Sequence, residues 1–222
     1  MIQLYGIPLG DKIPEREEER YLNLIPQVKR KKTKRFRFWQ DAQRTILGYS
    51  LINYLLTSRA DVGQDQIKME FDKYGKPHLI DLPYYFNISH SGDWIVCAVG
   101  DRPLGVDVER IGEIDIKIAD RFFARPEVLD LLSIAEEKQM DYFFTLWTLK
   151  ESYIKAEGQG LSIPLDTFWF RFDDDQLSFH ADDDPGWNFR LYPQLDGYKL
   201  ALCSLEEKLP DKMQIISREE LL

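Results

Sequence analysis

Apolar residues recur along the chain with two spacings, and each spacing predicts a different kind of element. Steps of three and four residues predict helices, most clearly over 41–56, where Leu47, Leu51 and Leu55 would share one face. The other helical patterns cover 15–25, 116–123, 127–132 and 141–157. Short segments rich in β-branched and aromatic residues predict strands. These segments are 3–9, 67–72, 87–89, 94–99 and 104–109, followed by a closing sheet of 168–172, 177–180, 188–192 and 199–204.

The order of these elements predicts an α+β protein. In both halves helices are mixed with a mostly antiparallel sheet. No Pro- or Ser-rich linker separates the halves, and the natural cut is near Asp101-Arg102-Pro103. This cut gives an N-terminal lobe of residues 1–102 and a C-terminal lobe of residues 103–222. Because a chain of 222 residues with 44% hydrophobic residues can bury two such cores, we expect two similar lobes with a shared cleft.

The composition argues against several classes of protein. No apolar run approaches the ~20 residues of a membrane span, and the first residues lack the layout of a signal peptide. Cys97 and Cys203 lie far apart, each in an apolar stretch, which indicates two buried free thiols rather than a disulfide or a metal site. We therefore expect a cytoplasmic protein without a membrane partner.

The charge is distributed unevenly. A net charge of −9 argues against general nucleic-acid binding. Yet residues 29–37 read Lys-Arg-Lys-Lys-Thr-Lys-Arg-Phe-Arg, with seven basic residues in nine. Such a segment in an acidic protein indicates a local anion to hold, and it is equally typical of a solvated helix face or an import-like patch. The segment alone leaves these readings open.

Two groups of charged residues could hold a cation. In Gly105-Val106-Asp107-Val108-Glu109, strand alternation would place both carboxylates on one face and both valines in the core. Paired carboxylates suit Mg²⁺, although an exposed strand face would look the same. Further on, Glu151 and Lys155 are four residues apart on a predicted helix, as in an ordinary surface ion pair. A helix that packs on the sheet would instead bring this third carboxylate to the first two.

Two further segments could contact phosphate. Ser89-His90-Ser91-Gly92 is predicted to be a loop between two strands, with hydroxyls, an imidazole and free backbone N–H groups for phosphate oxygens. A hydrogen-bonded structural histidine is the alternative there. Tyr74-Gly75-Lys76-Pro77 predicts a turn that presents a lysine and an aromatic ring, or else a plain surface turn.

Together these segments resemble the 4′-phosphopantetheinyl transferase superfamily, in its two-lobed, surfactin-type branch. The resemblance rests on motifs that occur in order along nearly the whole chain. They are Tyr-Gly-Lys-Pro at 74–77, Phe-Asn-Ile-Ser-His-Ser at 86–91, Gly-Val-Asp-Val-Glu at 105–109, Trp-Thr-Leu-Lys-Glu-Ser-Tyr-Ile-Lys at 147–155 and Gly-Gln-Gly-Leu at 158–161. Ser152 stands where the family often has alanine, and both residues are small.

The resemblance implies a pseudo-twofold fold with coenzyme A (CoA) in the cleft between the lobes. It implies Asp107, Glu109 and Glu151 as ligands of Mg²⁺, with Mn²⁺ possible, and Glu151, Lys155 and Asp107 as catalytic residues. The residues implied at CoA are Lys29, Lys32, Arg44, Thr45, Tyr74, Gly75, Lys76, Pro77, Ser89, His90 and Lys155.

The implied reaction transfers the 4′-phosphopantetheine group of CoA to a serine of an apo carrier protein, giving holo carrier and 3′,5′-ADP. The partners would be carrier proteins or domains of peptide, polyketide or fatty-acid synthases, docking near 121–123 and 158–161, and the chain would act as a monomer. Three other hypotheses are a nucleic-acid-binding protein, a CoA-binding scaffold without turnover, and a metal-dependent phosphohydrolase.

Overall fold

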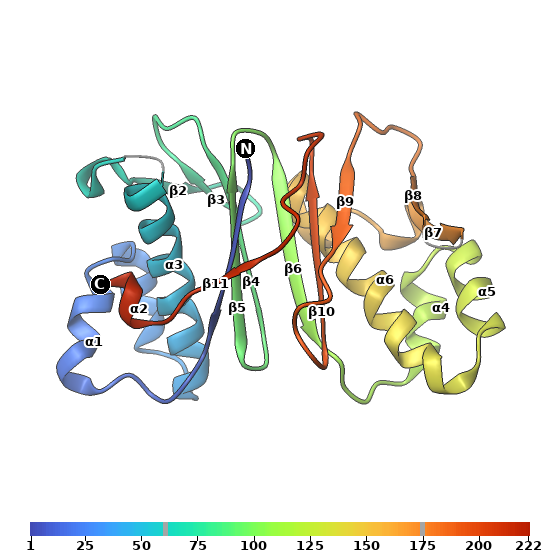
Figure 1. Ribbon diagram of the computed structural model, residues 1–222, viewed down its shortest axis with the longest axis horizontal. Coiled ribbons are helices and arrows are strands. Elements are labelled where there is room, and N and C mark those ends of the chain that lie inside the picture. The colour runs from blue at the N-terminus through green and yellow to red at the C-terminus, as the bar shows by residue number, and fades with distance from the viewer. Residues whose placement is uncertain (60–61, 174–175) are drawn as a thin grey trace.

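The computed structural model describes residues 1–59, 62–173 and 176–222, and its elements fall into two halves (Figure 1). The first half holds three helices and five strands. They are β1 (Gln3–Pro8), α1 (Glu15–Leu22), α2 (Gln27–Thr33), α3 (Trp39–Arg59), β2 (Met69–Phe71), β3 (Pro77–Leu79), β4 (Tyr85–Ser91) and β5 (Trp94–Gly100).

The second half repeats this mixture with another long helix. Its elements are β6 (Leu104–Arg110), α4 (Ala119–Phe122), α5 (Arg125–Ser133), α6 (Glu136–Glu157), β7 (Trp169–Asp173), β8 (Gln176–His180), β9 (Asn188–Leu191) and β10 (Tyr198–Ser204). The chain then returns to the first half, where β11 (Gln214–Ile215) pairs with β1. Single 3-10 turns occupy 64–66, 116–118, 160–162, 165–167 and 219–221.

Two sheets stand side by side in the middle of the molecule, with the helices of each half on the outside (Figure 1). The strand orders are β11-β1-β5-β4 and β6-β10-β9, and all of these pairs except β1–β11 are antiparallel. Short hairpins β2–β3 and β7–β8 complete the structure. The predicted α+β architecture with mostly antiparallel sheets is therefore confirmed.

Three hydrophobic clusters follow from strand alternation. One lies between α3 and the first sheet, and another lies between α6 and the second sheet. The third fills the space between the sheets, where Leu4 and Val96 meet Val106, Val108 and Leu202. Because Val106 and Val108 face this shared core, Asp107 between them must face away from it, toward α6.

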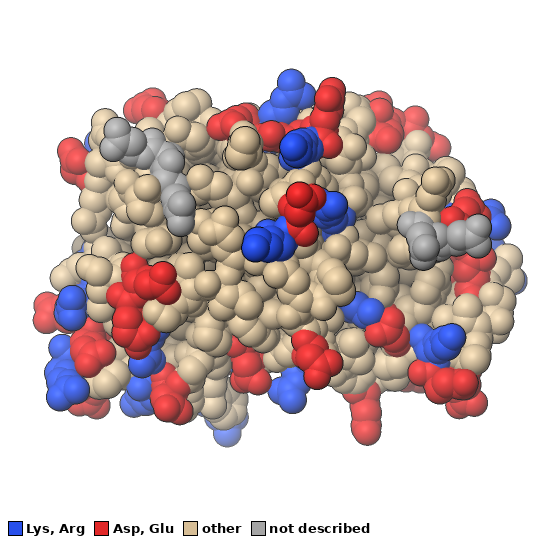
Figure 2. All heavy atoms as spheres, in the orientation of Figure 1, with Lys and Arg blue, Asp and Glu red and all other residues tan. Residues whose placement is uncertain are grey.

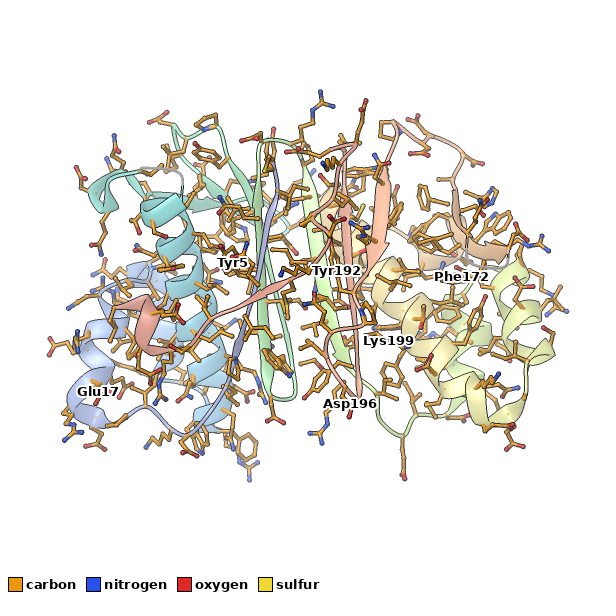
Figure 3. The ribbon with its side chains drawn as sticks, viewed as in Figure 1. Tyr5, Glu17, Phe172, Tyr192, Asp196 and Lys199 are labelled. Atoms are coloured by element: carbon orange, nitrogen blue, oxygen red, sulfur yellow. The ribbon has the colours of Figure 1, made fainter. Side chains whose placement is uncertain are left out.

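Side-chain contacts also connect the elements of the second half. Lys199 on β10, labelled in Figure 3, donates a 2.7 Å hydrogen bond to Asp141 on α6. Tyr192, also labelled, is buried in the core between the sheets. On the face shown in Figure 2, acidic and basic side chains are interspersed. No helix among the described residues is long and apolar enough to cross a membrane.

Two predictions about the strands were wrong. The segments 168–172 and 177–180 do not join the closing sheet, because β7 and β8 pair only with each other. Phe170 is instead buried in the aromatic core beside α6, and the partly buried Phe179 packs against it. The predicted loop at 89–92 is also wrong, because β4 continues to Ser91 and pairs Ser89, His90 and Ser91 with β5.

Candidate active site

The candidate site lies where β4 and β6, the edge strands of the two sheets, come into contact. Side chains rather than a backbone ladder connect them. Alternate residues of β4 point toward β6, as the two-residue period of a strand requires. The bonds are Val106 N to Asn87 Oδ1 at 3.0 Å, Ser89 Oγ to Asp107 Oδ1 at 2.7 Å, Ser91 Oγ to Glu109 Oε2 at 2.8 Å and Arg110 N to Ser91 Oγ at 3.1 Å.

Helix α6 lies directly on β6 because Gly105 has no side chain. A Cβ atom at Gly105 would stand 2.1 Å from the carbonyl oxygen of Ser152, far inside van der Waals contact. The close approach places the last two turns of α6 over the strand that carries Asp107 and Glu109. Glu151 and Lys155, one helical turn apart, therefore face these two carboxylates.

Lys155 connects the helix to both strands. Its Nζ donates to Asp107 Oδ1 at 2.5 Å and to Ser89 Oγ at 2.9 Å. Asp107 is only 2% exposed, and its second oxygen, Oδ2, is buried without a hydrogen-bond partner in the described structure. Burial raises the pKa of Asp107, although Lys155 and Ser89 oppose the shift.

The other two carboxylates are perturbed in the same direction. Burial raises the pKa of Glu151 to about 7, with repulsion from Asp107 and Glu109 adding to the shift and Lys155 opposing it. Burial and Asp107 likewise raise the pKa of Glu109, while its bond from Ser91 lowers it. Three acids around a single lysine thus hold more negative charge than the lysine can balance.

These residues fit a divalent cation in their chemistry. Asp107 Oδ2 lacks a partner, and no hydrogen bond from the described residues reaches the Glu151 carboxylate. Oxygen donors of this kind are the ligands that Mg²⁺ prefers. Within residues 1–59, 62–173 and 176–222, no three acidic, histidine or cysteine side chains are arranged so that they could hold a metal ion. Lys155 occupies one Asp107 oxygen instead.

A cationic cavity of about 220 Å³ lies on the first half of the molecule. Lys29 and Lys32 have no ion-pair partner among the described carboxylates, and the Nζ of Lys29 lies 4.6 Å from the ring centroid of Phe71. Burial and repulsion from Lys32 lower the pKa of Lys29. The predicted residues that line this cavity are Lys29, Lys32, Arg44, Thr45, Pro77 and His90.

Comparison with known proteins identifies the chain. Over its full length it is 39% identical to 4′-phosphopantetheinyl transferase Sfp of Bacillus subtilis (strain 168), and the match covers 100% of both chains. The chain belongs to the 4′-phosphopantetheinyl transferase superfamily. Residues 14–101 match the family described as 4′-phosphopantetheinyl transferase, N-terminal, and residues 103–203 match the 4′-phosphopantetheinyl transferase superfamily. The predicted resemblance to the surfactin-type branch is therefore confirmed, and the activity is transfer of 4′-phosphopantetheine to carrier proteins.

Two further relatives and one solved structure are similar to the transferase. The transferase psf-1 of Bacillus pumilus is 38% identical over 97% of this chain and 94% of its own, and gsp of Aneurinibacillus migulanus is 42% identical over 75% and 70%. A solved holo-(acyl-carrier-protein) synthase from Bacillus anthracis, in complex with CoA (3′,5′-ADP), is 17% identical over 48% of this chain and 96% of that one, with a TM-score of 0.42.

Some predicted CoA residues of the transferase already have protein partners. Arg44 donates through Nε and Nη2 to the carbonyl of Gly92 at 3.0 and 2.7 Å and pairs with Asp41 at 2.8 Å. Thr45 Oγ1 donates to the carbonyl of Asp41 at 3.0 Å. The ammonium of Lys76 donates to two carbonyls at the end of α6.

The remaining predicted CoA residues lie in the turn at 74–77 and beside His90. Tyr74 is exposed, and Gly75 has φ +84 in the predicted turn, but neither lines the cavity. Burial, Lys155 and Arg44 lower the pKa of His90, which favours the neutral imidazole near pH 7.

Sequence reasoning missed Asn87 and Ser91 as partners of β6 in the transferase. Reading 89–92 as a loop hid the alternation of Asn87, Ser89 and Ser91 on one face of the strand. The signal was present as polar residues at every second position beside the apolar Phe86 and Ile88. Of the suggested docking residues, Phe123 is buried in the second-half core, whereas Leu161 is 71% exposed.

Proposed function

We propose that the transferase uses Asp107, Glu109, Glu151 and Lys155, between the lobes 1–102 and 103–222, to move the phosphopantetheine arm of CoA in a magnesium-dependent reaction. The observation that carries this proposal is the bond from Lys155 to Asp107, with Glu109 and Glu151 in electrostatic contact with both, beside a cationic cavity. CoA has a pyrophosphate and a 3′-phosphate, so its site must balance several negative charges.

Asp107, Glu109 and Glu151 would hold Mg²⁺, and Mn²⁺ accepts the same oxygen ligands. When bound, the cation polarises the phosphoryl oxygens and offsets charge that develops on them. Ser89 and Ser91 orient Asp107 and Glu109 through the bonds described above, so the two carboxylates are held in a fixed geometry. Such outer hydrogen bonds commonly decide how well ligands are presented.

Glu151 accepts the proton of the attacking serine. In the metal-free protein burial raises the pKa of this carboxylate to about 7, and a bound cation would lower it and keep the carboxylate ionised and able to accept a proton. The serine oxygen forms a bond to the β-phosphorus, the bond from that phosphorus to the bridging oxygen breaks, and 3′,5′-ADP leaves. Lys155 donates from its ammonium to the pyrophosphate and stabilises the leaving group.

The cationic cavity holds the nucleotide end of CoA. Lys29 and Lys32 bind the 3′-phosphate, because they are the cations of the cavity without a carboxylate partner among the described residues. His90 contacts the pyrophosphate beside Ser89, while Arg44 and Thr45 form the adjoining wall. At the mouth, Pro77 and the turn of Tyr74 and Gly75 frame the nucleotide.

Mass spectrometry of an apo carrier protein tests the proposal. The carrier, incubated with the transferase, CoA and Mg²⁺, should gain the mass of one phosphopantetheine arm, and a carrier with alanine in place of its serine should not. Chelation of divalent ions should stop the reaction. Steady release of 3′,5′-ADP from CoA without any carrier would show a phosphohydrolase instead, and full activity in excess chelator would refute the metal requirement.

A further inference from the structure

The ammonium of Lys76 crosses from the first half of the molecule to the end of α6. Its Nζ donates to the carbonyl oxygen of Lys155 at 2.6 Å and to that of Ala156 at 2.9 Å. No carboxylate among the described residues forms an ion pair with Lys76, so these two carbonyls are its strong partners. The sequence predicts that Lys76 contacts the nucleotide of CoA, but in the structure its ammonium binds backbone carbonyls of the protein.

Lys76 supplies hydrogen bonds that the C-terminal end of α6 lacks. Helix α6 ends at Glu157, and its last carbonyls have no partner within the helix. Its end also carries the negative pole of the helix dipole, which a cation stabilises. Gly158 closes the helix with φ 82 and returns its N–H to the carbonyl of Ile154 at 3.0 Å, and Lys76 binds two of the carbonyls that remain.

Gly158 at the end of α6 and the turn around Lys76 both contribute to a close fit at this contact. A Cβ atom at Gly158 would lie 2.9 Å from Cδ of Lys76, so a side chain there would displace the lysine. On the other side, Asp72 Oδ1 accepts from the backbone N–H groups of Tyr74 and Lys76 at 2.8 and 2.9 Å. These two bonds fix the backbone of the turn that carries Lys76, so the lysine side chain extends toward α6 from a defined position.

The contact also acts on a residue of the site. Lys155 is held at both ends: its carbonyl by Lys76, and its ammonium by Asp107 and Ser89. Glu151 lies one turn earlier on the same helix. Since phosphoryl transfer depends on positioning, a small displacement of this turn would move both groups relative to the phosphates.

We propose that Lys76 is a positioning residue that fixes the last turn of α6 to the first half and thereby orients Lys155. The inference rests on the proposed role of Lys155 in transfer. Its consequence is that Lys76 contributes to turnover more than to the binding of CoA, whereas a direct ligand of the nucleotide would do the opposite.

Lys76→Met tests the inference, because it keeps the aliphatic stem and removes the ammonium. We expect kcat for carrier modification to fall about tenfold to a hundredfold, with KM for CoA changed less than about threefold. Hydrogen exchange of the backbone amides at 156–162, measured without substrates, should become faster. Lys76→Arg should restore most of both, since a guanidinium can donate to the same two carbonyls.

Lys73→Met is the matched control. It removes one positive charge from the same turn, where Lys73 is exposed and lies over the Tyr74 ring at 4.8 Å from its centroid, with no bond to α6. This variant should match the wild type in kcat and in exchange. A rise in KM for CoA with unchanged kcat and unchanged exchange in Lys76→Met would overturn the inference. So would a lower melting temperature with unchanged kcat.

Two further results keep the test decisive. If Lys76→Met does not fold, Lys76→Gln replaces it, because glutamine keeps a polar side chain on a shorter stem and removes the ammonium. A loss of kcat in Lys76→Gln then supports the inference, and a loss of CoA affinity alone overturns it. If the wild type modifies no carrier, the proposed function fails, while the exchange measurement still decides whether Lys76 holds the end of α6.

Discussion

Replacing Glu151 with glutamine should make the metal-free transferase more stable while it abolishes transfer. Glu151 shares the site with Asp107 and Glu109, and its pKa is raised from 4.5 to about 7. The fold therefore disfavours the ionised carboxylate, which is the form that the proposed chemistry needs. Glu151→Gln keeps the size of the side chain and removes the charge, so stability and activity should change in opposite directions.

The magnitude follows from the difference between the two pKa values. Because the folded protein has the higher pKa, it keeps the proton between pH 4.5 and 7 while the unfolded chain releases it. The free energy of unfolding of the wild type therefore falls as the pH rises through this window. The full difference corresponds to about 3 kcal/mol, and partial solvent screening leaves an expected effect of about 1–3 kcal/mol.

Urea unfolding of both proteins in a chelator, at about pH 5 and about pH 8, measures this effect. Glu151→Gln should exceed the wild type by about 1–3 kcal/mol at the higher pH and by little at the lower one. Added Mg²⁺ should stabilise the wild type at the higher pH, by about 2.7 kcal/mol at a hundred times its dissociation constant, and should stabilise the variant less. A variant less stable than the wild type at about pH 8, or a difference independent of pH, would refute the reasoning.

Three other substitutions test separate parts of the structure. Gly105→Ala should force α6 away from β6 and greatly reduce carrier modification, because its methyl group would lie 2.1 Å from the Ser152 carbonyl oxygen. Circular dichroism checks that the variant folds, and near-normal activity would contradict the close packing. Lys150→Met should lower the free energy of unfolding in urea by about 3–5 kcal/mol, because it leaves the Glu127 carboxylate buried without its ion-pair partner at 2.7 Å. The double variant with Glu127→Leu should recover much of this lost stability. Lys29→Ala should raise KM about tenfold for CoA in steady-state assays and have little effect with dephospho-CoA, which lacks the 3′-phosphate. Equal effects on both substrates would show that Lys29 binds elsewhere on CoA.

The α+β class and the main elements could be predicted from the sequence because their signals are local. The apolar steps of three and four residues correspond to α3 and α6, and the alternation around Asp107 predicted its orientation correctly. The short strand β3 and the two-residue strand β11 were not predicted, because such short segments contain too few residues to show the alternation of apolar and polar positions. In β11, Gln214 and Ile215 depend on pairing with β1, more than two hundred residues earlier in the chain.

Side-chain partners were harder to predict than elements, because they depend on which distant segments meet. Nothing near Lys76 in the sequence indicates that its ammonium binds the end of α6, 79 residues later. Likewise, the fully buried pair of Lys150 and Glu127 is formed only when α5 packs beside α6. The roles of the predicted site residues remain predictions, and the structure adds which groups stand close enough to act together.

The contact between β4 and β6 explains how so many polar groups can be buried between two sheets. Each is the edge strand of its own sheet, and an exposed edge leaves backbone N–H groups without partners. Here side chains of β4 supply those partners, as Asn87 does for Val106 N and Ser91 for Arg110 N. Because the same face of β4 also bonds Asp107, the residues that join the sheets also orient the acids. The proposed site therefore draws on both halves of the molecule, and a change that separates the two edges should lower carrier modification before urea unfolds either half.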